Sequence, residues 1–313
     1  YYRMAGLWQQ NSFRKRCVAT FSGNSRVVQV IMNKILVLGY HGQVASSLRL
    51  LKANDASYTF LDREMIQAHN PSVITEILRS LNPSAVINCA AYTAVDKAET
   101  DQQACWALNS QFVGLLAALS SELDFHLIHF STDYVFDGRG SRPYREIDQT
   151  GPVNYYGSSK LDGEKLILER AKSACIVRTS WVYSEFGANF VRTMLRLSER
   201  VQPLKVVSDQ TGCPTYAGDL AELASGPLLT LRGKVELFHF SNEGEATWHE
   251  FAEEIMRLWK TEKKVERIRT IDFPTPALRP AYGVMDKQKI TSALQLSVSH
   301  WTEALARCKS KWV

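Results

Sequence analysis

Tyr156 and Lys160 stand four residues apart in the segment YGSSK, and Thr132 ends an apolar run in HLIHFSTDYVF. Residues four apart on a helix share one face, so the lysine ammonium can lie beside the phenol and stabilise its ionised form. A free tyrosine has a pKa of about 10, so proton transfer near neutral pH needs such a charge. The Thr132 hydroxyl would hydrogen-bond the reacting oxygen. Spacing alone is more typical of a surface pair on an amphipathic helix, so this interpretation depends on its surroundings.

A glycine loop, Gly39-Tyr-His-Gly42-Gln-Val-Ala45, follows the first apolar run and opens a helical pattern. The first glycine permits a tight turn, the second lets the backbone approach a pyrophosphate, and a small third residue allows close packing. Phosphates would then meet the N–H groups at the helix N-terminus. Glycines also simply terminate strands. The position directly after a strand nevertheless favours a dinucleotide site.

Asp62 ends the second apolar run, 23 residues after Gly39. A carboxylate there would bind the adenosine ribose hydroxyls and favour NADH, whereas the neighbouring Arg63 could accept the 2′-phosphate of NADPH. Both cofactors therefore stay open. The third run closes with small residues that would let the cofactor lie close to the backbone. The residues expected to contact the cofactor are Gly39, Gly42, Gln43, Val44, Asp62, Arg63, Ala91, Tyr92, Thr93, Tyr156 and Lys160.

Short apolar runs alternate with segments of helical period from Lys34 onward. Runs that are apolar on both faces and separated by helices predict a doubly wound α/β fold, a Rossmann-type parallel sheet covered on two sides. The expected strands are 35–38, 57–61, 85–88, 126–131 and 174–180, and the expected helices are 44–52, 71–81, 101–123 and 156–171.

The pattern becomes irregular after Ser180, which suits a smaller C-terminal substrate-binding domain over the carboxyl ends of the strands. We expect a dinucleotide-binding domain over 32–180 with returning segments at about 204–245. The substrate-binding domain would comprise 181–203 and 246–313.

The net charge of +5 lies entirely in residues 1–31, which hold five basic residues and no acid. We expect this stretch to be a disordered leader, with a transit peptide as the alternative. The neutral remainder gives no reason to expect a nucleic-acid groove, and no apolar run approaches membrane-spanning length. Six cysteines without CxxC or other ligand spacing predict reduced thiols in a cytoplasmic protein.

The chain resembles the extended short-chain dehydrogenase/reductase family, and within it the reductases of dTDP-4-dehydrorhamnose. The resemblance covers residues 32–313 and is carried by GYHGQV, NCAAYTAVDKAE, STDYVFDG, PVNYYGSSKLDGEK, RTSWVY, NFVRTML, DQTGCPT, TWHEFA and RPAYGVMD. It implies that NADPH or NADH delivers a hydride to C4 of a 4-keto-6-deoxy sugar nucleotide while Tyr156 protonates the emerging alkoxide. Lys160 would tune Tyr156 and hold the nicotinamide ribose, and Thr132 would orient the carbonyl.

The resemblance also implies sugar contacts from Asp133 and Trp181 and a pyrophosphate clamp from Arg279, whose guanidinium is a bidentate donor. Three residues depart from the family pattern: Ala45 at the third glycine, Gly283 at a common serine, and Ser47. Some relatives have a glutamate in place of Ser47 that helps to bind a magnesium ion at a dimer interface. We therefore expect a monomer or weak homodimer, no membrane or nucleic-acid partner, and no catalytic metal.

Two alternatives share the fold. Sugar-nucleotide 4,6-dehydratases place an Asp-Glu pair directly after the threonine, whereas Asp133 is followed here by Tyr134. A sugar-nucleotide 4-epimerase would share the same fold. A non-catalytic, NADP-binding regulatory subunit similar to the β subunit of methionine adenosyltransferase comes from a different class. The intact set of Thr132, Tyr156 and Lys160 favours an enzyme.

Overall fold

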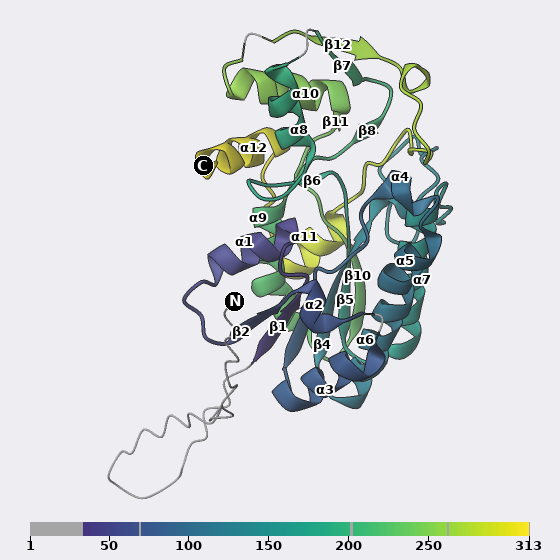
Figure 1. Ribbon diagram of the computed structural model, residues 1–313, viewed down its shortest axis with the longest axis vertical. Helices are drawn as coiled ribbons and strands as arrows, with labels where there is room; N and C mark the ends of the chain where they lie inside the picture. The colour runs from purple at the N-terminus through teal and green to yellow at the C-terminus, as the bar shows by residue number, and fades with distance from the viewer. Residues whose placement is uncertain (1–33, 69, 201–202, 262, 313) are drawn as a thin grey trace, which may run out of the picture. The chain divides into compact units, whose positions relative to one another are not determined.

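Six parallel strands form the central sheet, in the order β10-β5-β4-β3-β1-β2 (Figure 1). They are β1 (Ile35–Leu38), β2 (Tyr58–Leu61), β3 (Ala85–Asn88), β4 (His126–Thr132), β5 (Ala174–Thr179) and β10 (Val235–His239). The inner strands are buried on both faces, as their continuous apolar runs require. The expected doubly wound α/β class is confirmed.

The computed structural model describes residues 34–68, 70–200, 203–261 and 263–312. The expected leader at 1–31 lies outside the described residues. None of the helices in the described part is long and apolar enough to cross a membrane.

Helices cover both faces of the sheet. One face packs against α3 (Pro71–Leu81), α6 (Phe112–Glu122) and α7 (Tyr155–Arg170) through Ile74, Leu116 and Ile167. The other packs against α1 (Gln43–Leu51), α9 (Ala217–Ser225) and α11 (Gln288–Leu294) through side chains such as Leu48, Leu220 and Ile290. Each such side chain, when fully buried, contributes about 1.5–3 kcal/mol of transfer free energy. Short helices complete this part: α2 (Arg63–Ile66), α4 (Val95–Ala98), α5 (Gln102–Trp106), η2 (Asp133–Val135) and η3 (Pro227–Leu231).

A further apolar cluster joins elements from the second half of the chain. It includes Tyr183, Met194, Phe251 and Trp301. Its elements are α8 (Phe190–Ser198), α10 (Trp248–Leu258) and α12 (Trp301–Ser310), with β7 (Leu204–Val207) paired to β12 (Val265–Ile268), β6 (Val182–Tyr183) to β9 (Thr215–Tyr216), and β8 (Thr211–Gly212) to β11 (Ala246–Thr247). η4 (Thr270–Asp272) follows β12. The division of residues between two domains stays a prediction.

The helix expected over 101–123 is instead three segments, with a π-helical turn η1 (Ala107–Gln111) between α5 and α6. The turn brings Asn109 against the backbone of Tyr92, whose N–H donates to Asn109 Oδ1 at 2.8 Å and whose carbonyl accepts from Nδ2 at 3.0 Å. Asn109 Nδ2 also reaches Ser159 on α7. π-helical turns are frequent at functional sites, where they re-aim a side chain.

Candidate active site

The glycine loop lies where the direction of strand order reverses, between β1 and β3, which is the usual ligand-binding crevice of such sheets. Gly39 has φ +91°, and a Cβ there would lie 2.7 Å from the Ala90 nitrogen. Gly42 immediately precedes α1 and offers no side-chain acceptor to its first N–H groups. This bare helix N-terminus and the closely approached backbone fit a dinucleotide pyrophosphate.

The side chain of Gln43 is used within the protein. Its Nε2 donates to the Val182 carbonyl at 3.1 Å, and its Oε1 accepts from Ser184 Oγ at 2.9 Å and from Asn189 Nδ2 at 3.1 Å. These bonds attach the glycine loop to the segment that follows β5. The main chain of Gln43 and one N–H of its side-chain amide are left for a cofactor, and the next residue, Val44, packs with the apolar cluster around α1.

The other residues expected at the cofactor follow β2 and β3. Asp62 caps α2, because its Oδ1 accepts from the Met65 N–H at 2.8 Å, and Arg63 is exposed. Tyr92 is bound by Asn109 through its backbone and by Asp101 through its hydroxyl at 3.0 Å. Ala91 is half-buried and Thr93 is exposed beside it. These residues follow the carboxyl ends of β2 and β3, the two strands that flank β1 on either side in aligned parallel register.

Tyr156 lies in the first turn of α7 and meets Thr132, the last residue of β4. A hydrogen bond from the Thr132 side chain lowers the pKa of Tyr156, but burial raises it more, so the net shift is upward. The ring also packs edge-to-face on Tyr134, with 5.8 Å between centroids. The Tyr156 phenol is therefore protonated near neutral pH, as a proton donor must be.

Gly157 allows this close approach of α7 to the turn η2. A Cβ at Gly157 would lie 2.2 Å from the Tyr134 carbonyl oxygen. Asn154 begins the helix by accepting the Gly157 N–H at 2.8 Å. A second glycine, Gly163, brings the same helix against Asn109, whose carbonyl oxygen would lie 2.3 Å from a Cβ. The two glycines thus set how closely α7, which carries Tyr156 and Lys160, packs against η2 and η1.

Lys160 is buried, and its ammonium position is set by β4. The Nζ atom donates to the Phe130 carbonyl at 2.6 Å and lies 3.0 Å from His129 Nε2. Burial lowers the pKa of Lys160 to about 8, against an opposing effect of Glu164 one helical turn away. Lys160 shares a helix face with Tyr156, but the groups that hold its Nζ belong to the neighbouring strand.

Asp133 is buried directly after Thr132 and accepts from the threonine hydroxyl at 3.1 Å. Burial raises the pKa of Asp133 to about 7. Its Oδ2 lies against Gly283, where a Cβ would be only 2.5 Å away. The departure from serine at position 283 therefore gives Asp133 its room.

Trp181 and Arg279 are engaged with other side chains. The Trp181 ring stacks on Trp248 at 3.5 Å between centroids, from a backbone with φ +47°. Arg279 forms a bidentate pair with Asp96, both N–O distances being 2.7 Å, and is 19 % exposed. Its charge also acts on nearby Tyr134, lowering the pKa of that phenol against the larger effect of burial.

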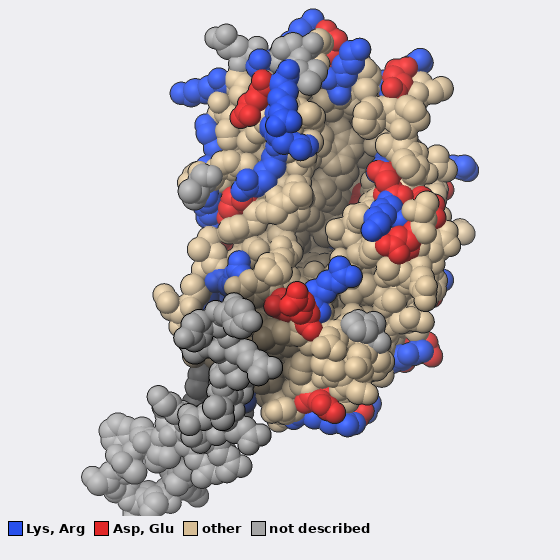
Figure 2. Space-filling model, in the orientation of Figure 1, with Lys and Arg blue, Asp and Glu red and all other residues tan. Residues whose placement is uncertain are grey.

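Sequence reasoning missed four residues that shape the site: Asn88, Asn109, His129 and Trp248. A histidine inside an otherwise apolar strand, such as His129 in β4, is itself a signal of a buried polar contact. Within the described residues, no cluster of three or more His, Cys, Asp or Glu side chains could hold a metal ion. Figure 2 shows acidic and basic side chains interspersed on the visible face.

Comparisons with known proteins agree with this geometry. A family model described as RmlD substrate binding domain matches residues 32–312. The dTDP-4-dehydrorhamnose reductase of Sinorhizobium fredii is 37% identical over 286 residues, covering 88% of this chain and 96% of that protein. A probable dTDP-4,6-dihydroxy-2-methyloxan-3-one 4-ketoreductase of Streptomyces antibioticus is also 37% identical, covering 86% of this chain and 92% of that protein.

A solved structure supports the same assignment. The dTDP-4-dehydrorhamnose reductase of Bacillus anthracis, crystallised in complex with NADP, has a TM-score of 0.85 and 31% identity to this chain. The match covers 89% of this chain and 99% of that one. The chain therefore belongs to the RmlD substrate binding domain family, the family of the dTDP-4-dehydrorhamnose reductases.

Proposed function

We propose that this protein is an NAD(P)H-dependent reductase that converts the C4 keto group of dTDP-4-dehydro-L-rhamnose into the alcohol of dTDP-L-rhamnose. One observation carries the proposal: Tyr156, whose pKa is raised by desolvation, lies at Thr132 at the carboxyl end of β4, in a chain related over nearly its whole length to such reductases. Thr132 and Tyr156 come from different elements, so their meeting is a property of the fold and not of spacing.

The chemistry follows from what each residue can do. NADPH or NADH, when bound along the glycine loop, supplies the hydride. Thr132 orients the carbonyl oxygen by hydrogen bonding, and Tyr156 gives its phenolic proton to that oxygen as negative charge develops. Burial keeps the Tyr156 proton in place until then, because it disfavours the phenolate. We assign the ribose of the cofactor to Lys160 and Asp62.

The substrate side of the proposal uses Asp133, Trp181 and Arg279, with 181–203 and 246–313 as the substrate-binding domain. Asp133 is adjacent to Thr132, which supports a sugar contact. Arg279 already pairs with Asp96, so a pyrophosphate must either displace Asp96 or use the remaining guanidinium N–H groups. The five described cysteines are free, which supports a reducing compartment such as the cytoplasm. We also propose a monomer or weak homodimer.

The test is NAD(P)H oxidation by the purified protein, followed at 340 nm, with and without dTDP-4-dehydro-L-rhamnose. Tyr156→Phe should abolish turnover, whereas Tyr155→Phe, which changes the neighbouring tyrosine that packs on Trp106, should retain it. Running NADH and NADPH in parallel gives the cofactor preference, and NMR of the product gives its C4 configuration. Cofactor binding without turnover of this or any keto-sugar nucleotide would contradict the proposal and favour a regulatory subunit.

A further inference from the structure

The indole ring of Trp181 is covered on both of its faces. Trp248 stacks on one face, with 3.5 Å between ring centroids and 8° between ring planes. Gly212 covers the other face. The atoms nearest to a Cβ at Gly212 would be Cε2, Nε1 and Cζ2 of Trp181, at 2.6, 2.8 and 2.9 Å. Nearly equal distances to three adjacent ring atoms place this Cβ above the ring plane, and on the Trp248 side it would meet Trp248 first.

Both sides of this space, which we call the Trp181 slot, come from one pair of short strands. Gly212 lies in β8 and is the antiparallel register partner of Ala246 in β11. Trp248 follows β11 directly, as the first residue of α10. The pairing of β8 with β11 therefore sets the width of the slot. Glycine is needed at position 212 because a side chain there would take the place of the Trp181 ring.

A chain of hydrogen bonds fixes the orientation of Trp248. Its Nε1–H donates to Oε1 of buried Gln210 at 3.2 Å, and Gln210 Nε2 donates to Thr270 Oγ1 at 3.0 Å. The Thr270 hydroxyl donates in turn to Asp209 at 2.6 Å. The indole N–H of Trp248 is thus bound within the protein, so a ligand cannot use it.

The indole N–H of Trp181 is free by comparison. Among the described residues, none accepts a hydrogen bond from Trp181 Nε1, and this atom is not one of the buried polar atoms that lack a partner. It is therefore accessible to solvent or to a ligand. Trp181 also has φ +47°, a left-handed conformation that is rare for a bulky residue and is concentrated at functional sites.

The position of Trp181 in the fold is close to the expected reaction. Trp181 lies two residues after Thr179, which ends β5. Thr179 is the register partner of Thr132, which ends β4. A sugar whose carbonyl is bound at Thr132 would therefore have Trp181 beside it, just beyond the end of the adjacent strand.

The segment 281–285 connects the slot to Asp133. The Gly283 N–H donates at 2.8 Å to the carbonyl of Thr211, the other residue of β8. Gly283 also lies against the Asp133 carboxylate, whose Oδ2 would be 2.5 Å from a Cβ at that position. The slot and the carboxylate next to Thr132 therefore flank the same short stretch of backbone.

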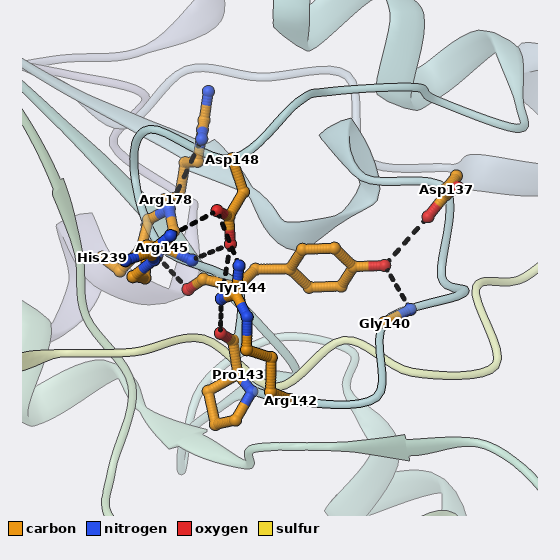
Figure 3. A network of polar contacts seen from close by, with 9 residues as sticks. All are labelled: Asp137, Gly140, Arg142, Pro143, Tyr144, Arg145, Asp148, Arg178 and His239. Atoms are coloured by element: carbon orange, nitrogen blue, oxygen red, sulfur yellow. Dashed lines mark hydrogen bonds and ion pairs between the residues drawn. The ribbon is translucent and has the colours of Figure 1, made fainter.

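Tyr144 holds the other edge of this segment. Its N–H donates to the Val284 carbonyl at 2.9 Å. Its hydroxyl accepts from the Gly140 N–H at 2.7 Å and donates to Asp137 Oδ1 at 2.9 Å (Figure 3). Bonds at both ends of Tyr144 thus keep the segment, and with it β8, in place.

We propose that Gly212 and Trp248 are positioning residues that hold Trp181 with its edge, and not a face, toward the substrate. With both faces covered, Trp181 cannot stack on a sugar ring or a base. The one polar group on its edge is Nε1–H, which can only donate. The slot therefore selects a sugar nucleotide that presents an acceptor oxygen to Trp181. The catalytic meaning of this arrangement rests on the proposed function.

The slot can be tested without cofactor or substrate, by NMR of the protein with ¹⁵N-labelled tryptophan. Trp181→Phe and Trp248→Phe assign the two indole N–H signals. The Trp248 N–H, bound to Gln210, should exchange slowly with solvent, and the Trp181 N–H should exchange quickly. Stacking should shift the ring protons of Trp181 upfield, and Trp248→Leu should abolish that shift while Trp248→Phe preserves it. Slow exchange at Trp181, or ring protons that do not respond to Trp248→Leu, would overturn the proposal.

The donor role of Trp181 is tested by kcat/KM for dTDP-4-dehydro-L-rhamnose. Trp181→Phe keeps an aromatic ring but removes the N–H donor. Loss of one hydrogen bond should lower kcat/KM by about 2- to 12-fold. A contact through the ring face would instead survive this change, so an unaltered kcat/KM in Trp181→Phe would refute the donor role.

Trp248→Leu separates positioning from a merely structural role. If Trp248 acts through Trp181, this change lowers kcat/KM in the unaltered protein but has little further effect in Trp181→Phe, where the positioned group is already absent. Equal losses in both backgrounds would contradict the proposal. Trp248→Phe, which keeps a ring against Trp181, should restore most of the activity that Trp248→Leu loses.

Trp259→Leu is the matched control. It removes a tryptophan at the other end of α10, where the ring contacts Trp312, and should leave kcat/KM unchanged in both backgrounds. A loss as large as that of Trp248→Leu would show that any disturbance of α10 is sufficient. A protein that turns over no keto-sugar nucleotide would refute the proposed function, whereas the tryptophan NMR would still decide whether the slot exists.

Discussion

Replacing Gly157 by alanine tests whether the depth of α7 sets the reaction geometry. A Cβ at this position would lie 2.2 Å from the Tyr134 carbonyl oxygen, whereas ordinary contact begins at 3.4 Å. The obstacle is backbone, so α7 and the turn after β4 must separate by about 1 Å. Since Tyr156 lies on one side and Thr132 on the other, a misplacement of that size costs about 100-fold in rate, or about 2.7 kcal/mol of transition-state stabilisation.

The stability effect of Gly157→Ala is the difference between two opposing contributions. Overpacking costs about 1–3 kcal/mol, while alanine gains about 1 kcal/mol over glycine within a helix. The expected net loss is therefore up to about 2 kcal/mol. The protein should stay folded while its activity falls, so kcat/KM from NAD(P)H oxidation and urea unfolding should be measured on the same preparation.

Gly114→Ala is the matched control for Gly157→Ala. It also places a Cβ on a helix, but the nearest atom is the end of the flexible Leu166 side chain, at 2.8 Å, which can move aside. We expect near-normal activity and a change in unfolding free energy within about 1 kcal/mol. If Gly157→Ala keeps the kcat/KM of the unaltered protein, or if Gly114→Ala loses as much activity, the reasoning is refuted.

Three further predictions concern buried groups. Arg178→Met should cost about 3–5 kcal/mol in urea unfolding, because it leaves the Glu164 carboxylate buried without its 2.7 Å partner; an effect below about 1 kcal/mol would contradict a buried charge pair. Burial raises the pKa of Asp133 to about 7, against about 4 unfolded, so the folded chain holds a proton that the unfolded chain releases. The free energy of unfolding therefore falls as pH rises from about 4 to 7. Asp133→Asn removes this fall, so the unfolding free energy of the variant relative to the unaltered protein should increase over that pH range. If Asp133 were ionised in the folded protein, that difference would not change with pH. Gly283→Ser should displace the Asp133 carboxylate, which would lie 2.5 Å from the new Cβ, and so raise KM for the sugar nucleotide. An unchanged KM would show that Asp133 does not contribute to substrate binding.

The strands and most helices were predictable because their causes are local. The segment 71–81 was expected as a helix from its apolar period, and α3 is Pro71–Leu81. The strand-end position of Thr132 and the glycine loop before α1 were found in the same way. The π-helical turn at Ala107–Gln111 was not expected, because its visible partners are tertiary. Asn109 there binds the backbone of Tyr92 and the side chain of Ser159, which lie 17 and 50 residues away.

The position of the Lys160 Nζ atom is a second feature that the sequence alone does not predict. A spacing of four residues correctly places Tyr156 and Lys160 on one helix, but it says nothing about where the end of a four-carbon side chain is held. The structure places Nζ between the Phe130 carbonyl and His129, both on β4. Thr132, which lies at the Tyr156 phenol, ends that same strand. Strand β4 therefore supplies the groups that meet both helix residues: Thr132 lies at the Tyr156 phenol, and Phe130 and His129 contact the Lys160 amine.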